Sequence, residues 1–151
     1  MQQVFVSIGS NIDPRNNIEE ARIILGNLFD CTFSGLYETR AEGFEGNDFI
    51  NSVVAFETDL QLVELRDKLK QIEKKMGRTD IQKGMSDRII DLDIILYGDQ
   101  VIEDGDFDIP SKDIENYLFV LEPLAEIAGE LLHPISNLSF SEILKAFHSK
   151  N

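Results

Sequence analysis

Two aspartates interrupt an otherwise apolar, strand-like run in the chain. Residues 88–98 have the sequence RIIDLDIILYG, in which isoleucine and leucine surround Asp91 and Asp93. Because side chains alternate along a strand, both carboxylates point to one face, with Cα atoms roughly 6.5 Å apart. Two carboxylates this close repel each other, and burying them without a partner is costly. A divalent cation such as Mg²⁺ removes both problems, since it takes one or two carboxylates and completes its shell with water and phosphate oxygens.

A solvated pair is the alternative interpretation of the same pattern. Asp91 and Asp93 would then lie on an open sheet face and form a salt bridge, for instance with Arg88. In either case the alternation turns four apolar side chains to the opposite face, where we expect helices to cover them. These side chains are Ile90, Leu92, Ile94 and Leu96.

The segments around this run show alternating strand and helix patterns. Apolar residues recur at helical spacing in two of them and at strand spacing in the others. We expect strands over 4–9, 31–39, 48–58 and 88–98, and helices over 17–29 and 62–77. The order strand–helix–strand–strand–helix–strand is that of a ferredoxin-like βαββαβ core, an α+β fold with both helices on one face of the sheet.

The remainder of the chain indicates a helical extension. It is acidic and loop-like from 98 to 108, and a helix-containing segment over 117–134 precedes a final helix over 139–149. Ser139 or Ser141 can serve as the N-cap of that final helix. The extension would cover the other face of the sheet and produce a three-layer α/β/α arrangement.

Composition narrows the class of protein. The length of 151 residues and the 42% hydrophobic content predict one domain spanning 1–151. The net charge of −14 disfavours nucleic acid and anionic membranes as partners. The single cysteine, Cys31, fits a reducing compartment, and no secretory signal begins the sequence. We therefore expect a cytoplasmic protein. We also expect a monomer, although composition does not determine the oligomeric state.

The positive charges are concentrated just before the aspartate pair. Eight of the fourteen lysines and arginines lie between Arg66 and Arg88, with only four acids among them. A local basic patch beside an acidic pair suits a metal-bound polyphosphate. The alternative is a solvated helix face, which is the usual explanation of a charge run.

Several motifs together resemble the 6-hydroxymethyl-7,8-dihydropterin pyrophosphokinase family. The most specific is the R-x-x-D-L-D-I element that begins at Arg88. The others extend nearly from end to end: VSIGSNI at 6–12, DFINSVVAFET at 48–58, IEKKMGR at 72–78, and FVLEPLAEIA at 119–128 followed by HP at 133–134. The ferredoxin-like order agrees with the fold of that family.

The resemblance implies a reaction and a set of site residues. Pyrophosphate would pass from ATP to the pterin alcohol in folate biosynthesis, and AMP would leave. Two Mg²⁺ ions would bind Asp91 and Asp93, which with Arg78 and Arg88 form the catalytic set. The pterin would contact Thr39, Gly43, Phe49, Asn51 and Phe119. ATP would contact Glu73, Arg78, Lys83, Arg88, Ser111 and Lys112.

Departures from the family pattern lie on the nucleotide side. Asp80 and Gly84 stand where loop arginines are expected, Ser111 and Lys112 replace a histidine and an aromatic residue, and Tyr117 replaces a base. An arginine fork binds phosphate in a way that aspartate cannot. Three interpretations follow: a working pyrophosphokinase with altered ATP contacts, a diverged pterin-binding paralogue with a different donor or substrate or with weak catalysis, and a ferredoxin-like interaction domain.

Overall fold

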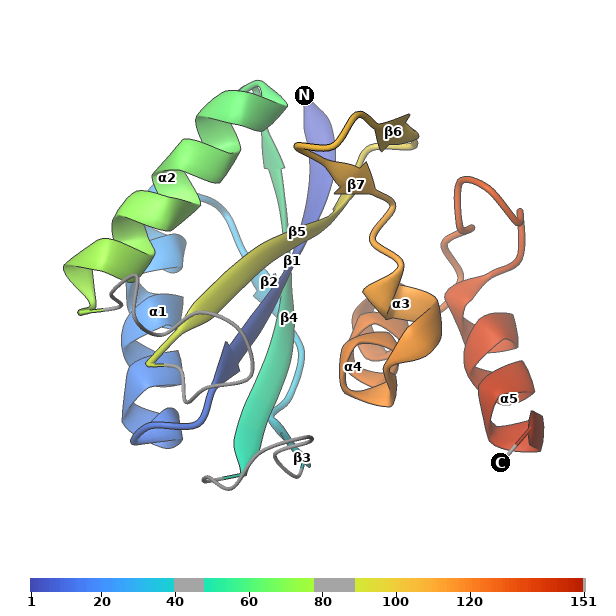
Figure 1. Ribbon diagram of the computed structural model, residues 1–151, viewed down its shortest axis with the longest axis horizontal. Coiled ribbons are helices and arrows are strands. Elements are labelled where there is room, and N and C mark those ends of the chain that lie inside the picture. Colours follow the sequence, from blue (N-terminus) through green and yellow to red (C-terminus); the bar gives the residue numbers. More distant parts are fainter. Residues whose placement is uncertain (40–47, 78–88, 151) are drawn as a thin grey trace.

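An antiparallel sheet forms the centre of the protein (Figure 1). The computed structural model describes residues 1–39, 48–77 and 89–150. The central strand, β1 (Gln2–Ser10), pairs with β4 (Phe49–Thr58) on one side and with β5 (Asp91–Tyr97) on the other. Two short strands, β2 (Thr32–Phe33) and β3 (Tyr37–Thr39), pair with the outer edge of β4. This order confirms the predicted ferredoxin-like core.

Two helices cover one face of the sheet: α1 (Pro14–Leu28) and α2 (Leu62–Lys75). Their apolar stripes pack on the side chains of β1 that point to this face, and the resulting core includes Val4, Val6, Ile8, Ile18, Ala21, Leu25, Leu65, Leu69 and Ile72. A capping box between Gln61 and Glu64 begins α2, and Gly77, with a φ of 101°, follows its last turn. Glycine tolerates that left-handed conformation without a Cβ clash.

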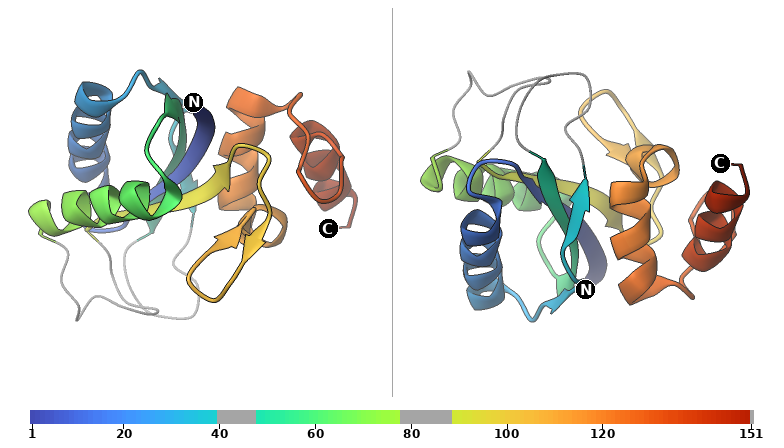
Figure 2. Two further views of the ribbon diagram at one scale, coloured as in Figure 1. Left: turned by 90° about the horizontal axis from the view of Figure 1, so that it is seen from above. Right: turned by 90° about the horizontal axis from the view of Figure 1, so that it is seen from below.

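The C-terminal helices cover the opposite face (Figure 2). The chain passes through a small hairpin of β6 (Ile102–Glu103) and β7 (Asp108–Ile109), and then through α3 (Asp113–Asn116). Next, α4 (Leu118–Ala128) packs on the sheet, and α5 (Phe140–Lys150) packs against α4. The second core joins Phe5, Val53 and Ile95 of the sheet with Val120, Leu121, Leu124 and Phe140 of the helices. The predicted three-layer α/β/α arrangement is therefore confirmed.

The capping of the last helix follows one of the two predicted alternatives. The backbone N–H of Glu142 donates to Ser139 Oγ at 3.1 Å, and the N–H of Ser139 donates to Glu142 Oε1 at 3.1 Å. This reciprocal pair is a capping box, so Ser139 is the N-cap. Among the described residues, no helix is both long and apolar enough to cross a membrane.

The prediction of one continuous strand over 31–39 is wrong, because the structure has two short strands there, β2 and β3. At Ser34 the backbone N–H donates to Val53 O at 2.8 Å, and the buried hydroxyl accepts the Val53 N–H at 2.9 Å. The Ser34 hydroxyl thus replaces a backbone acceptor in the pairing with β4. The chain leaves the sheet after Ser34 and returns to it at Tyr37. Helix boundaries also shift, since α1 begins at Pro14, a residue suited to the first helical turn, and α4 ends at Ala128.

A β-bulge in β5 overturns one expected orientation. The pairing with β1 shifts by one residue, so that Val6 lies opposite Ile94 while Phe5 lies opposite Leu96. The extra residue, Ile95, reverses the alternation beyond it. Ile90, Leu92 and Ile94 pack toward α1 and α2 as predicted, whereas Leu96 packs in the core beneath α4.

Candidate active site

A row of three residues crosses the sheet near the end of β1. Gly9 lies opposite Asn51 of β4 on one side and opposite Asp91 of β5 on the other. Residues directly opposite in antiparallel strands share a face. This face is the one that α4 covers, because Val53, two residues beyond Asn51, packs in the core beneath α4. We call Asn51, Gly9 and Asp91 the cross-strand row.

The absence of a side chain at Gly9 makes room for its neighbours. A Cβ at this position would lie 3.1 Å from Asn51 Oδ1 and 3.8 Å from Phe49 Cδ1. The Asn51 amide and the Phe49 ring therefore lie directly over the Gly9 backbone, and a side chain there would displace the amide. A glycine inside a strand often marks such a close approach. The glycine in VSIGSNI was the available signal, although its role is visible only in the structure.

Asn51 has a buried donor that no described residue satisfies. Its side chain is 7% exposed, and Nδ2 has no hydrogen-bond partner. Leaving a buried N–H group unpaired costs about 1–3 kcal/mol, so such groups are rare in folded proteins. A ligand that presents an acceptor would remove this penalty. The amide is thus arranged to bind something other than its own chain.

Aromatic and hydroxyl side chains flank the row on the Asn51 side. Phe49 is on the same face of β4 as Asn51, and Thr39 of β3 lies opposite Phe49. Phe119 lies in the first turn of α4, which covers this face. Its ring stacks on that of Tyr117, with centroids 4.9 Å apart and planes inclined by 27°. The structure therefore brings Thr39, Phe49, Asn51 and Phe119 to one side of the sheet.

The two aspartates lie on the same face of the sheet as Asn51, but on β5, on the other side of β1. Asp93 is opposite Ser7 and is exposed, while Asp91 is half-buried. Within the described ranges, no three His, Cys, Asp or Glu side chains are grouped closely enough to hold a metal ion by themselves. A carboxylate pair fits Mg²⁺, because this ion usually binds one or two carboxylates and takes its other ligands from water and substrate phosphates.

Glu73 fixes the beginning of β5 from α2. Its side chain is 7% exposed, and Oε2 accepts the backbone N–H of Leu92 at 2.7 Å. Leu92 lies between the two aspartates, so this bond holds the backbone that carries both carboxylates. The predicted contact between Glu73 and ATP stays a prediction. The structural role was not visible in the sequence, because the bond joins residues 19 positions apart.

Ser111 and Lys112 follow β7 and lie against the far end of β5. The Ser111 N–H donates to Ile95 O at 2.9 Å, and Ser111 Oγ accepts the Asp113 N–H at 3.2 Å. The exposed Lys112 donates its backbone N–H to Asp108 Oδ2 at 3.3 Å. Burial, and secondarily the charge of Asp108, raises the pKa of Asp113.

Comparison with known proteins identifies the family. The model of 7,8-dihydro-6-hydroxymethylpterin-pyrophosphokinase (HPPK) matches residues 5–129. Two relatives carry the name 2-amino-4-hydroxy-6-hydroxymethyldihydropteridine pyrophosphokinase. The Haemophilus influenzae protein is 33% identical over 97% of this chain and 94% of its own length. The Aquifex aeolicus protein is 35% identical over 100% of this chain and 93% of its own length. The chain belongs to the HPPK family.

Solved structures support the HPPK fold independently. The Plasmodium falciparum HPPK-DHPS with pteroate matches with a TM-score of 0.77 at 15% sequence identity. The match covers 99% of this chain and 43% of that longer chain. At this identity the similarity establishes the fold, and it agrees with the ferredoxin-like order derived from the sequence.

Part of the predicted HPPK site lies outside the described residues. This applies to Gly43 on the pterin side and to Arg78, Lys83 and Arg88 on the ATP side. Their assignments stay predictions, as do those of the described site residues, whose roles no comparison tests. What the structure adds is that the described pterin and metal candidates share one face of the sheet.

Proposed function

We propose that this HPPK family member transfers a pyrophosphoryl group from ATP to 6-hydroxymethyl-7,8-dihydropterin in folate biosynthesis and releases AMP. The observation that carries the proposal is the cross-strand row, with the unpaired Asn51 amide at one end and the aspartate pair at the other. Strands in a sheet are about 4.8 Å apart, so the backbones of Asn51 and Asp91 are separated by about 9.6 Å. A ligand that binds both ends would therefore span the backbone of Gly9.

The pterin would bind at the Asn51 end. A carboxamide offers both a donor and an acceptor, which suits the polar edge of a pterin. Phe49 and Phe119 would stack on the ring faces, since flat heterocycles pack well against aromatic side chains. Thr39, the last residue of β3, and Gly43 are the further proposed pterin contacts. Burial of the Asn51 amide gives this end its selectivity, because a ligand without an acceptor would leave Nδ2 unpaired.

The phosphates of ATP would bind at the aspartate end. Asp91 and Asp93 would hold Mg²⁺, with two ions proposed, and the bound metal would neutralise negative charge on the phosphate chain. Arg78, Arg88, Lys83, Ser111 and Lys112 are the proposed ATP contacts, with Glu73 holding the strand beneath them. The pterin hydroxymethyl oxygen would attack the β-phosphorus in line, and the bond between that phosphorus and the AMP oxygen would break. Positioning and electrostatics then supply the rate, without a covalent enzyme intermediate.

The diverged-paralogue alternative gains no support from the comparisons. Relatives from several bacteria carry the pyrophosphokinase name at 33–35% identity over most of the chain. The unusual residues Asp80 and Gly84 lie outside the described residues. A direct assay therefore decides between the two functions.

The test measures AMP release from ATP in the presence of the pterin and Mg²⁺. We expect AMP only when the pterin is present, and a loss of about 100-fold or more in Asp91→Asn and in Asp93→Asn, since each removes charge from the metal site. Asp99→Asn is the matched control, because it makes the same charge change at an exposed position just beyond β5. Pterin binding without AMP release would favour the diverged paralogue, and equal activity in all variants would contradict the metal role.

Four further expectations stay predictions. They are that residues 1–151 form one domain, that the protein is a monomer, that it acts in the cytoplasm, and that it binds neither nucleic acid nor membrane. Size-exclusion chromatography with light scattering would test the oligomeric state directly.

A further inference from the structure

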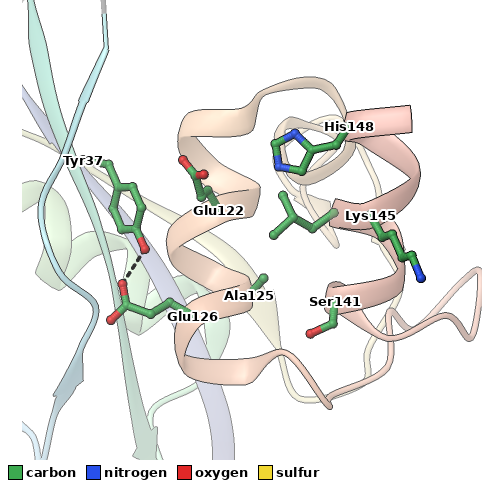
Figure 3. A pocket seen from close by; sticks show the side chains of 8 residues that line it. Tyr37, Glu122, Ala125, Glu126, Ser141, Lys145 and His148 are labelled. Atoms are coloured by element: carbon green, nitrogen blue, oxygen red, sulfur yellow. Dashed lines mark hydrogen bonds between the residues drawn. The ribbon is translucent and has the colours of Figure 1, made fainter. Parts of the chain in front are cut away.

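Glu126 of α4 accepts hydrogen bonds from Gly35, which precedes β3, and from Tyr37, the first residue of β3. Its Oε1 and Oε2 each accept the Gly35 N–H at 3.1 Å. The Tyr37 hydroxyl donates to Oε1 at 2.5 Å. Figure 3 shows the two side chains facing each other across the space between β3 and α4. We call these contacts among Glu126, Gly35 and Tyr37 the Glu126 bridge.

The Glu126 bridge joins two elements that carry proposed pterin contacts. Tyr37 lies opposite Asn51, so it extends the cross-strand row by one strand. Thr39, two residues further along β3, is on the same face as Tyr37. At the other side of the bridge, Phe119 precedes Glu126 by about two turns of α4. The bridge therefore ties the β3 wall of the pterin site to the helix that carries Phe119.

We propose that Glu126 and Tyr37 are positioning residues that hold β3 against α4 and thereby set the width of the pterin site. The proposal rests on the proposed function. Neither residue needs to touch the substrate, because both act through Thr39 and Phe119. A carboxylate acceptor makes stronger hydrogen bonds than a neutral one, and Glu126 accepts from two donors, the Gly35 N–H, which its two oxygens share, and the Tyr37 hydroxyl.

The surroundings of Tyr37 keep its phenol protonated, and therefore a hydrogen-bond donor, to a higher pH than usual. Burial, followed by the hydrogen bond and charge of Glu126 and the charge of Glu122, raises the pKa of Tyr37 from 10.0 to about 12. The raised pKa favours the neutral phenol in the folded protein. The contribution of this phenol to the stability of the folded protein is therefore complete below about pH 10 and is lost as the pH rises toward 12. Tyr37, Glu122 and Glu126 line a surface groove, whose other lining residues include Lys145 and His148 of α5, on the side of α4 away from Tyr37 (Figure 3).

The test compares steady-state kinetics of four single variants with the unmodified protein. We expect Glu126→Ala to raise the KM for the pterin about three- to tenfold, with kcat and the KM for ATP within about twofold, since a lost charged hydrogen bond here weakens only pterin binding. Tyr37→Phe should show a smaller increase, and Glu126→Gln should restore much of the pterin affinity because it keeps an acceptor. Glu122→Gln is the matched control, because it removes one carboxylate charge from the same groove and leaves the hydrogen bonds of the Glu126 bridge in place.

Two kinetic results would overturn the proposal: an unchanged pterin KM in Glu126→Ala, or equal increases in the KM values for pterin and ATP. Calorimetric pterin binding separates this proposal from the proposed function. If the unmodified protein binds pterin without releasing AMP, the proposed reaction fails, and the bridge is then judged by the pterin Kd of the same four variants. If the unmodified protein does not bind pterin at all, both proposals fail.

Discussion

At the scale of single residues, the candidate site contains one group that the described structure leaves in an unfavourable state, the buried amide of Asn51. Asn51 keeps a buried N–H group without a partner in the described structure, and two carboxylates share one face of β5. The unpaired amide costs free energy in the absence of a ligand, whereas Asp91 is half-buried and Asp93 is exposed. In the proposed function, the amide would meet an acceptor edge of the pterin and the carboxylates would hold the metal-bound phosphates of ATP.

Substitution of Asn51 should separate stability from binding. In Asn51→Leu, an apolar side chain of similar size replaces an amide whose donor is unpaired, so we expect an unchanged or slightly higher midpoint of thermal unfolding. Pterin affinity should fall by about 10-fold or more, because the lost hydrogen bonds are buried. Differential scanning calorimetry and titration calorimetry measure the two effects. A parallel fall in stability and affinity would mean that the amide supports the fold instead of the ligand.

At the scale of elements, bonds from helices to strands set the geometry of the site. Glu73 of α2 holds Leu92 of β5, and Glu126 of α4 holds Gly35 and Tyr37 before and within β3. Each helix thus supports one edge of the sheet from a different face. The supported strands themselves carry site candidates, with Asp91 and Asp93 on β5 and Thr39 on β3.

Loss of the Glu73 contact should loosen β5. In Glu73→Ala the buried Leu92 N–H loses an acceptor, and we expect the free energy of unfolding to fall by about 1–3 kcal/mol. Urea denaturation measures this change, and AMP release should fall together with stability because both aspartates flank Leu92. Gln71→Ala, at an exposed position of the same helix, should change stability by no more than about 0.5 kcal/mol. Full stability combined with a raised KM for ATP would instead assign Glu73 to the nucleotide.

The local spacing of apolar residues was enough to predict most helices and strands. It did not predict the bulge or the hydrogen bonds between residues far apart in the sequence. Alternation along β5 predicted that Asp91 and Asp93 share a face, and helical spacing predicted α2 almost to its ends. The bulge at Ile95 was not predictable, because no glycine or proline marks it. The split of β2 from β3 depends on a hydroxyl of Ser34 that bonds to Val53, 19 positions away. The Glu126 bridge joins residues 89 and 91 positions apart, a separation that no periodic pattern reports.

At the scale of the whole molecule, the charge distribution is the dominant feature. The chain carries a net charge of −14, and ion pairs such as that between Arg15 and Glu38 are exposed. Exposed pairs contribute little to stability, so they do not offset the repulsion among the remaining acids. The folded state is therefore held by its two cores, one on each face of the sheet, against a general electrostatic repulsion.

Salt should consequently stabilise the protein. Raising NaCl from about 0.02 M to about 0.5 M shortens the screening distance from about 20 Å to about 4 Å, which weakens repulsion between surface charges. We expect the midpoint of thermal unfolding to rise by about 2–4 °C, equivalent to about 1 kcal/mol for a chain of this length. Differential scanning fluorimetry in NaCl and in KCl provides the measurement and its control. A midpoint that falls in both salts would show that attractive pairs outweigh the repulsion.

The bulge at Ile95 also limits how this site could be transferred to another protein. Before the bulge, β5 turns its carboxylates to the face of the cross-strand row, and after it Leu96 turns to the core on that same face. A designer who grafted only the two aspartates onto a regular strand would turn the side chain that follows Ile95 into the wrong layer. The portable unit is therefore the whole of Asp91–Tyr97, extra residue included, together with a central strand that can accept its shifted register.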